Sequence, residues 1–388
     1  MWLKIAWKNI IHKPLNSILC SSLVLFGVSI ISLLILLQRQ LEHKFEQNLN
    51  EIDIVIGAKG SPLQLVLSAI YHVDAPTGNI PINEVEQLLK DPMIEEAIPL
   101  AYGDTYKGYR VLGTDLSYLE HYDGELENGK LFNKPMEAII GFEIAQKTGL
   151  NVGDTFVGTH GDVEQGHVHD EHPYTVCGVL KPNNSVLDYI ILTNIQSVWN
   201  VHQGHHHAQQ EITAVLLKCK SKIAVLSLPR MINRTTTMQA VIPGLEINRL
   251  LNMIGIGTTT LKLIALGIIL MAALSVFFVM LGRLNERQHE LALMRVVGFR
   301  PIQLFGLLLV EGILLVVIGF VAGIGLSRIG VYILNNSSAS DFHLYLTYQL
   351  AGEELILFGI TMVVGIVAAF IPAVKVMRMN VSRILMEK

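Results

Sequence analysis

Four long apolar runs dominate the pattern of hydrophobic and polar positions along this chain. They cover residues 15–37, 263–281, 304–326 and 355–374. The first carries no charge, and at about 1.5 Å per helical residue it extends for roughly 34 Å, enough to cross the hydrocarbon core of a bilayer. The pattern predicts four transmembrane α-helices. The first is too long for the apolar part of a signal peptide, which indicates an uncleaved signal anchor.

Basic residues flank these runs unevenly. They gather before the first run, between the second and third, and after the fourth: Lys4, Lys8, Lys13, Arg283, Arg287, Arg295, Arg300, Lys375, Arg378, Arg383 and Lys388. The loop assigned between the third and fourth runs has Arg328 against Asp341, Glu353 and Glu354. The positive-inside rule predicts a multi-pass membrane protein with both termini in the cytoplasm.

Residues 38–253 then lie outside, and their pattern is that of a folded domain. "DIVIGA" (53–58), "YTVCGVL" (174–180) and "DYIILT" (188–193) predict strands, and "PINEVEQLLK" (81–90) predicts a helix. The predicted fold class is a membrane protein with four transmembrane α-helices and a large α+β extracytoplasmic domain between spans one and two. The predicted domains are 1–37, 38–253 and 254–388.

The two ends of this outer segment carry amphipathic patterns. Leu41, Phe45 and Leu49 recur at every fourth residue, and a second apolar stripe just before the second span comprises Leu250, Leu251 and Ile254. Two such helices would form a stalk that continues the spans outward. Two separate helices at the membrane surface are the alternative.

Composition supports a membrane protein and narrows the other classes. Hydrophobic residues make up 51%, charged residues 16%, and the mean hydropathy is +0.45. The net charge of −4 gives no reason to expect nucleic acid as a partner. Three cysteines exclude a disulfide-rich scaffold. Because Cys20 lies in an apolar run, Cys177 and Cys219 are left as the candidate disulfide pair.

Several motifs resemble those of a known family. "ERQHELALMRVVGFRP" (286–301) and "IPAVKVMRMNVSRIL" (371–385) resemble the cytoplasmic segments of MacB/FtsX-type ABC transporter permeases. "EAIIGFEIAQKTGLNVGDTF" (137–156), followed by "YTVCGVL", resembles the extracytoplasmic core domain of MacB-like members. Two features depart from the family. Asn380 and Val381 replace the usual Asp-Pro, and the turn before "YTVCGVL" is expanded, which leaves the usual substrates in doubt.

The resemblance implies a permease that works as a dimer, of identical or different chains, with two cytoplasmic ABC ATPase subunits. An extracytoplasmic binding protein is a further candidate partner. The chain has no G-x-x-x-x-G-K-[ST] motif, so ATP is expected to be bound and hydrolysed by the ATPase subunits, and the chain itself is not expected to be an enzyme. In this family, ATP-driven motion works the extracytoplasmic domains.

Residues between spans two and three, most of them charged, are candidates for coupling to the ATPase. On a predicted helix within 283–301, the candidates are Glu286, Arg287, Glu290, Met294 and Arg295. A short charged helix with an apolar edge suits a groove on a partner, although it also suits the membrane surface. Within span three, Glu311 is an intramembrane carboxylate that should face protein or water, as a buried hydrogen-bonding residue or as a proton relay. Gly319 and Gly323 predict close helix packing.

Eight of the fourteen histidines fall in two polar patches. The first holds His160, His167, His169 and His172, and the second holds His202, His205, His206 and His207. Neutral imidazole is a good ligand for zinc, copper and nickel, so the patches predict a site for zinc or another transition metal, with binding that weakens below about pH 6. The alternatives are an opportunistic chelator, or a solvated loop that is pH-responsive or has no role.

These observations predict a MacB-like ABC transporter permease linked to zinc or other transition-metal homeostasis. One alternative is an export or lipoprotein-extraction permease with incidental histidines. Another is an FtsX-like signalling protein that activates an extracytoplasmic enzyme.

Lys59, His72 and Asp74 lie in a Gly- and Pro-rich stretch and have two interpretations: they line a substrate surface, or they have a structural role.

Overall fold

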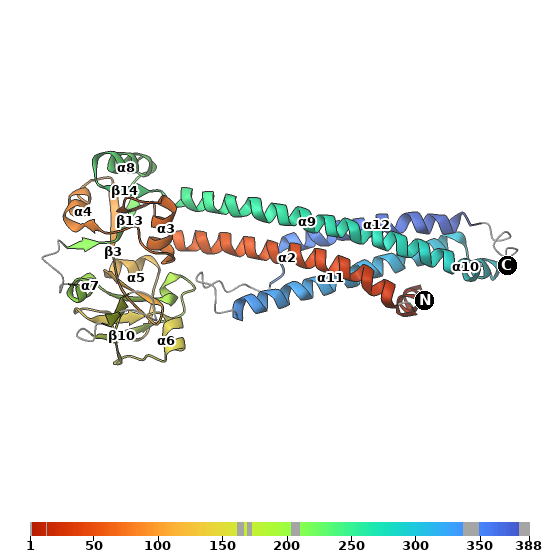
Figure 1. Ribbon diagram of the computed structural model, residues 1–388, viewed down its shortest axis with the longest axis horizontal. Helices are drawn as coiled ribbons and strands as arrows, with labels where there is room; N and C mark the ends of the chain where they lie inside the picture. The colour runs from red at the N-terminus through yellow and green to blue at the C-terminus, as the bar shows by residue number, and fades with distance from the viewer. Residues whose placement is uncertain are drawn as a thin grey trace. The chain divides into compact units, whose positions relative to one another are not determined.

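The computed structural model divides the chain into two compact units. One, here called the helical unit, comprises Met1–Leu41 and Met253–Lys388, and the other, the α+β unit, comprises Glu42–Asn252. The structure describes residues 2–12, 14–160, 167–168, 173–202, 210–336 and 349–379. Figure 1 labels the helices and strands of both units.

The helical unit is built from long apolar helices. Its elements are α1 (Trp2–His12), α2 (Pro14–Leu49), α9 (Pro243–Glu286), α10 (Gln288–Val296), α11 (Pro301–Asn336) and α12 (Gly352–Met377). Four of these, α2, α9, α11 and α12, are long and apolar enough to cross a membrane, which confirms the four predicted helices. The chain of α2 and α9 continues as helix into the α+β unit, so the residues of both predicted stalk stripes are helical, while their pairing stays a prediction.

The helices of this unit pack through small residues. A Cβ atom added to Gly319 of α11 would lie 2.7 Å from Cβ of Val24 in α2, and one added to Gly323 would lie 2.8 Å from the Leu25 carbonyl oxygen. Both glycines are therefore required by close approach of α11 to α2, which confirms the predicted role of this pair. A hydrophobic cluster that includes Val24, Val28, Ala265 and Ile269 also joins α2 to α9.

The α+β unit is organised by a mixed sheet. Along its main path, the described strands follow the order β14-β1-β13-β3-β4-β11-β6-β10-β5. The strands are β1 (Ile54–Ala58), β2 (Ile80–Pro81), β3 (Ile94–Tyr106), β4 (Tyr109–Thr114), β5 (Leu126–Gly129), β6 (Glu137–Ile140), β7 (Thr155–Phe156), β8 (Thr159–His160), β9 (His167–Val168), β10 (Tyr174–Leu180), β11 (Ile190–Asn194), β12 (Glu211–Ile212), β13 (Ala214–Cys219) and β14 (Met238–Val241). The helices are α3 (Pro62–Tyr71), α4 (Ile82–Leu88), α5 (Leu116–His121), α6 (Phe142–Thr148), η1 (Val186–Tyr189), α7 (Ile195–His202) and α8 (Lys222–Thr235).

The long strand β3 joins two halves of this sheet. Its first part pairs with β13 and its last part with β4, and each half has its own hydrophobic core. The quoted patterns predicted β1, β10 and α4 correctly, because buried strands are apolar throughout and α4 buries Val85 on one face. "DYIILT" begins as the short helix η1 and becomes β11 only from Ile190.

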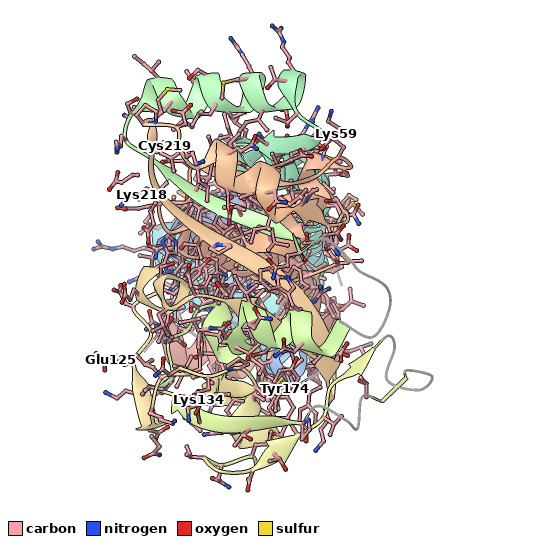
Figure 2. The ribbon with its side chains drawn as sticks, turned by 90° about the vertical axis from the view of Figure 1, so that its left-hand side faces the viewer. Lys59, Glu125, Lys134, Tyr174, Lys218 and Cys219 are labelled. Carbon is pink, nitrogen blue, oxygen red and sulfur yellow. The ribbon has the colours of Figure 1, made fainter. Side chains whose placement is uncertain are left out.

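The cysteine pairing considered from the sequence is wrong. Cys177 lies in β10 and Cys219 in β13, and both are buried free thiols. In Figure 2, Cys219 lies near the upper end of the sheet and Tyr174, at the start of β10, near the lower end. The two thiols lie in different halves of the sheet. Excluding Cys20 therefore left two cysteines that do not pair with each other.

Candidate functional site: the segment between α9 and α11

The predicted coupling segment is a helical turn between two long helices. α9 ends at Glu286, and after Arg287 the chain starts again as α10. At the end of α10, the Phe299 N–H donates to the Met294 carbonyl and the Gly298 N–H to the Arg295 carbonyl. These are the two hydrogen bonds of a Schellman cap, and Gly298 has the positive φ of 109° that this cap requires. The turn that follows leads directly into α11 at Pro301.

The two faces of α10 differ in exposure. Leu291 and Ala292 are buried, and Leu291 packs with Leu284 and Leu304 of the flanking helices. The opposite side exposes Leu293 (51%), Val296 (63%) and Val297 (80%). These three residues, here called the apolar ledge, were missed by the sequence reasoning, although the "VV" before Gly298 was a signal. An exposed apolar ledge beside charges is typical of a contact surface.

The charged residues of the segment are only partly paired. Nε of Arg287 lies 3.1 Å from a carboxylate oxygen of Glu290, an i,i+3 ion pair that is largely exposed on the glutamate side. Nη1 of Arg295 is buried and has no hydrogen-bond partner among the described residues. Met294 is half-buried, on the inner side of the helix. A buried guanidinium N–H without an acceptor costs about 1–3 kcal/mol.

Glu311 lies in α11 and is only 1% exposed. Its neighbour Gly312 is packed so closely against α12 that an added Cβ would lie 2.6 Å from Cβ of Ala369. Glu311 is thus surrounded by the helix bundle, an arrangement that avoids the cost of a carboxylate in lipid.

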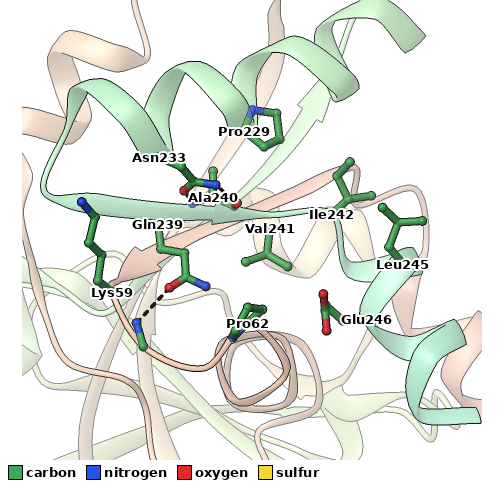
Figure 3. A pocket seen from close by; sticks show the side chains of 11 residues that line it. Lys59, Pro62, Pro229, Asn233, Gln239, Ala240, Val241, Ile242, Leu245 and Glu246 are labelled. Carbon is green, nitrogen blue, oxygen red and sulfur yellow. Dashed lines mark hydrogen bonds between the residues drawn. The ribbon is translucent and has the colours of Figure 1, made fainter. Parts of the chain in front are cut away.

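A separate groove opens on the α+β unit and is shown in Figure 3. It encloses about 480 Å³ and lies between α8, β14, the start of α9 and the loop before α3. Most of its lining is apolar: Pro62, Pro229, Val241, Ile242 and Leu245. Lys59 and Glu246 supply its charges, and Lys59 Nζ donates to the Thr236 carbonyl at 3.0 Å. The groove can therefore accept an apolar group. Lys59 lies on its wall and also contacts the segment that connects α8 to β14.

Comparison with known proteins identifies the family. Residues 17–231 match the MacB-like periplasmic core domain, and residues 262–381 match the FtsX-like permease C-terminal domain. The first match alone covers more than half of the chain. The chain belongs to the MacB/FtsX-type ABC transporter permeases.

Individual relatives are distant. The macrolide export ATP-binding/permease protein MacB of Neisseria gonorrhoeae is 23% identical over 303 residues, which cover 74% of this chain and 45% of the relative. This MacB/FtsX-type permease thus spans less than half the length of that relative. The periplasmic region of MacB from Actinobacillus actinomycetemcomitans (13% identity, 53% of this chain and 97% of that one) has a TM-score of 0.37. The extracellular domain of the transporter YknZ from Gram-positive bacteria (14%, 48% and 98%) has a TM-score of 0.32, and neither score supports a finer comparison.

The histidine patches of this MacB/FtsX-type permease are described only in part. β7 pairs with β10, and the two short strands β8 and β9, which lie between them in the sequence, pair with each other so that His160 is directly opposite His167. His202 is the last residue of α7. His169, His172, His205, His206 and His207 lie outside the described residues. Within the described ranges, no group of three or more His, Cys, Asp or Glu could hold a metal ion, so the metal site stays a prediction.

The other residues singled out near the α+β core have structural surroundings. His72 is half-buried between two tyrosine hydroxyls and does not line the groove. Asp74 caps its own loop by accepting from the Ala75 N–H at 2.7 Å. Of the three residues, only Lys59 lies on the groove wall.

A buried polar cluster in the helical unit escaped the sequence reasoning. It consists of Ser32, Ser327, Arg328 and Glu354. Arg328 and Glu354 had been assigned to a loop, which is wrong, because Arg328 lies within α11 and Glu354 in the first turn of α12. Both residues directly flank an apolar run, which could have indicated that they belong to the helices, although charged residues at such positions are commonly assigned to loops.

Proposed function

We propose that this chain is the permease subunit of a MacB-like ABC transporter, which couples ATP hydrolysis by a separate cytoplasmic ATPase to motion of its α+β unit. The observation that carries the proposal is α10, where the exposed apolar ledge lies beside the partly exposed side chain of Arg295. The basic residues around α10 favour the cytoplasm, where an ATPase would be met. An apolar edge beside a cation suits an acidic groove on such a partner.

The test is co-purification of ATPase activity with the tagged chain from the membranes of cells that make it. Val296→Asp and Arg295→Glu should each reduce this activity at least about tenfold, which corresponds to about 1.4 kcal/mol of lost binding. Ile223→Asp is the matched control, because Ile223 is a comparably exposed apolar residue (76%) on α8 of the other unit. If α10 merely lies on the membrane surface, the α10 variants will retain the activity of the control.

The remaining expectations about arrangement belong to the same proposal. The α+β unit lies outside the bacterial cytoplasmic membrane between spans one and two, and both termini lie in the cytoplasm. A second permease chain, identical or different, completes the dimer, and an extracytoplasmic binding protein meets the α+β unit. The basic segments at the span ends support this orientation.

We further propose that the transporter serves zinc or other transition-metal homeostasis. The eight histidines of the two patches support this, as does the backbone register in which His160 of β8 pairs with His167 of β9. Calorimetric titration of the detergent-solubilised chain with zinc should show binding that disappears when all eight are replaced by Ser. Binding should also weaken between pH 7.5 and 5.5, since protonated imidazole does not ligate metal. Equal binding by the Ser variant would reject the metal link.

Deletion phenotypes separate the alternatives. Growth that depends on metal supply favours the metal-linked transporter, and loss of envelope lipoprotein sorting or drug resistance favours an export or extraction permease. Failed cell separation favours an FtsX-like signalling protein.

A further inference from the structure

Three helices of the helical unit meet at the buried polar cluster. Ser32 comes from α2, Ser327 and Arg328 from α11, and Glu354 from α12, and Ser32, Ser327 and Glu354 are almost completely buried. Residues that far apart in the sequence share one hydrogen-bond network. The mechanism proposed above makes no use of it.

The carboxylate of Glu354 is satisfied on both oxygens. Oε1 accepts from the Ser32 hydroxyl at 2.5 Å, and Oε2 accepts from Nη2 of Arg328 at 2.7 Å and from the Ala351 N–H at 3.0 Å. The Ser327 hydroxyl lies 2.8 Å from that of Ser32. The single proton of Ser32 goes to the carboxylate, and the Ser327 hydroxyl has two acceptors for its own proton, the Ser32 oxygen and the Ile324 carbonyl at 2.8 Å.

Such a network is costly to open. Arg328 and Glu354 neutralise each other in a largely buried ion pair, and removing either partner would leave the other charge in the bundle without its counterion. Moving α2 away would leave Oε1 of Glu354 without the Ser32 hydroxyl that donates to it, whereas Ser327 would keep the Ile324 carbonyl of its own helix. The cluster therefore opposes separation of α2 from α11 and α12.

Close packing along the same helix pair acts in the same direction. The Ser21 hydroxyl donates to the Leu315 carbonyl at 3.2 Å, and Gly319 and Gly323 leave no space for a side chain between that contact and the cluster. The α2–α11 seam is thus hydrogen-bonded at two levels and in backbone contact between them. Sliding of one helix along the other would break both levels together.

We propose that α2, α11 and α12 move as one rigid body during the transport cycle, and that the Ser32–Ser327–Arg328–Glu354 cluster holds the three helices together. This inference rests on the proposed function, because it links the coupling segment to the α+β unit by chain continuity. α11 starts at Pro301, directly after the α10 turn, and α2 continues as helix to Leu49. A displacement of α10 would be passed through α11 and the cluster to α2.

The test is a disulfide between Ser32→Cys and Ser327→Cys in the full chain with Cys20, Cys177 and Cys219 replaced by Ser. Oxidation in native membranes, read as loss of maleimide labelling after denaturation, should be nearly complete without nucleotide. With ATP and vanadate the yield should be unchanged, and the cross-linked transporter should keep its ATPase activity. A yield that falls several-fold with nucleotide, or activity lost on cross-linking and restored by reduction, would overturn the proposal. The resting cross-link needs no ATPase, so its failure is distinguishable from failure of the proposed function.

Two further comparisons distinguish a specific role of the cluster in holding the helices together from a general loss of stability of the helical unit. Arg328→Gln leaves a buried unpaired carboxylate and should lower the rate of cross-linking about fivefold, whereas Arg328→Gln with Glu354→Gln should recover most of it. Gly323→Leu should lower the rate as well. Gly325→Leu is its matched control on the same helix, because no described atom lies within 4 Å of its added Cβ. If the double variant does not recover the rate of cross-linking, or if the two glycine variants lower it equally, the cluster does not hold the helices together.

Discussion

His72 is half-buried in the α+β unit and lies between two tyrosine hydroxyls. Its Nδ1 is 2.5 Å from the Tyr102 hydroxyl and its Nε2 is 2.7 Å from the Tyr118 hydroxyl. Because Tyr102 donates its proton to the Ser68 carbonyl, it accepts from Nδ1–H of His72, and Nε2 accepts from Tyr118. Burial, together with the nearby Arg110, lowers the pKa of His72 to about 3, so its imidazole is neutral at pH 7.

This environment predicts a pH dependence of stability. In the unfolded chain the pKa of His72 is near 6.5, so below that pH the unfolded form binds a proton that the folded form does not, and stability falls as the pH drops toward 3. Between pH 7 and pH 5 the free energy of unfolding should decrease by about 2 kcal/mol more in the natural chain than in His72→Gln, which cannot titrate. Denaturant unfolding of the full chain in detergent measures both. Parallel pH profiles for the two chains would contradict the assignment.

At the scale of elements, β14 is an edge strand whose outer side is closed by α8. The side-chain amide of Asn233 donates to the Ala240 carbonyl at 3.0 Å and accepts from the Ala240 N–H at 2.7 Å (Figure 3). The hydroxyl of Thr236 accepts from the Met238 N–H. Side chains from the α8–β14 connection thus take up hydrogen-bonding groups that another strand would otherwise pair with.

Removal of the Asn233 amide should lower the stability of the α+β unit and leave the outer edge of β14 without these hydrogen bonds. Asn233→Ala should lower the free energy of unfolding by about 1–2 kcal/mol, because the two partly buried groups of Ala240 lose their partners. It should also cause association that increases with protein concentration, measured by light scattering. Arg230→Ala, at an exposed position of the same helix, should change neither quantity. An Asn233→Ala chain as stable and monodisperse as this control would show that the edge needs no cap.

At the scale of the whole molecule, the orientation in the membrane can be tested with single cysteines in a chain whose own three are replaced. Lys134 is exposed on the α+β unit (Figure 2), and Arg300 is exposed just before α11. In spheroplasts, Lys134→Cys should react with a membrane-impermeant maleimide, and Arg300→Cys should react only after permeabilisation. The reverse labelling pattern would place α10 outside and remove it from the reach of a cytoplasmic ATPase.

The amino-acid sequence by itself determined the elements whose signal is local. Four apolar runs predicted α2, α9, α11 and α12, since the cost of leaving so many apolar side chains in water depends on the run alone. The continuous apolar strand β10 and the glycine pair of α11 were likewise readable from spacing. The family could be predicted because its cytoplasmic motifs and core domain occur in order along the chain.

Tertiary structure decided which distant residues meet. Nothing near Glu354 in the sequence indicates Ser32 or Arg328 as partners, and its charge resembled that of a loop residue until packing buried it. The separation of Cys177 from Cys219 depends likewise on the order of strands in the sheet. The exposed ledge of α10 became visible only once Leu291 and Ala292 were seen to face the bundle. Hydropathy and periodicity act over a few turns of chain, whereas partners and exposure depend on the helices and strands that pack around each residue.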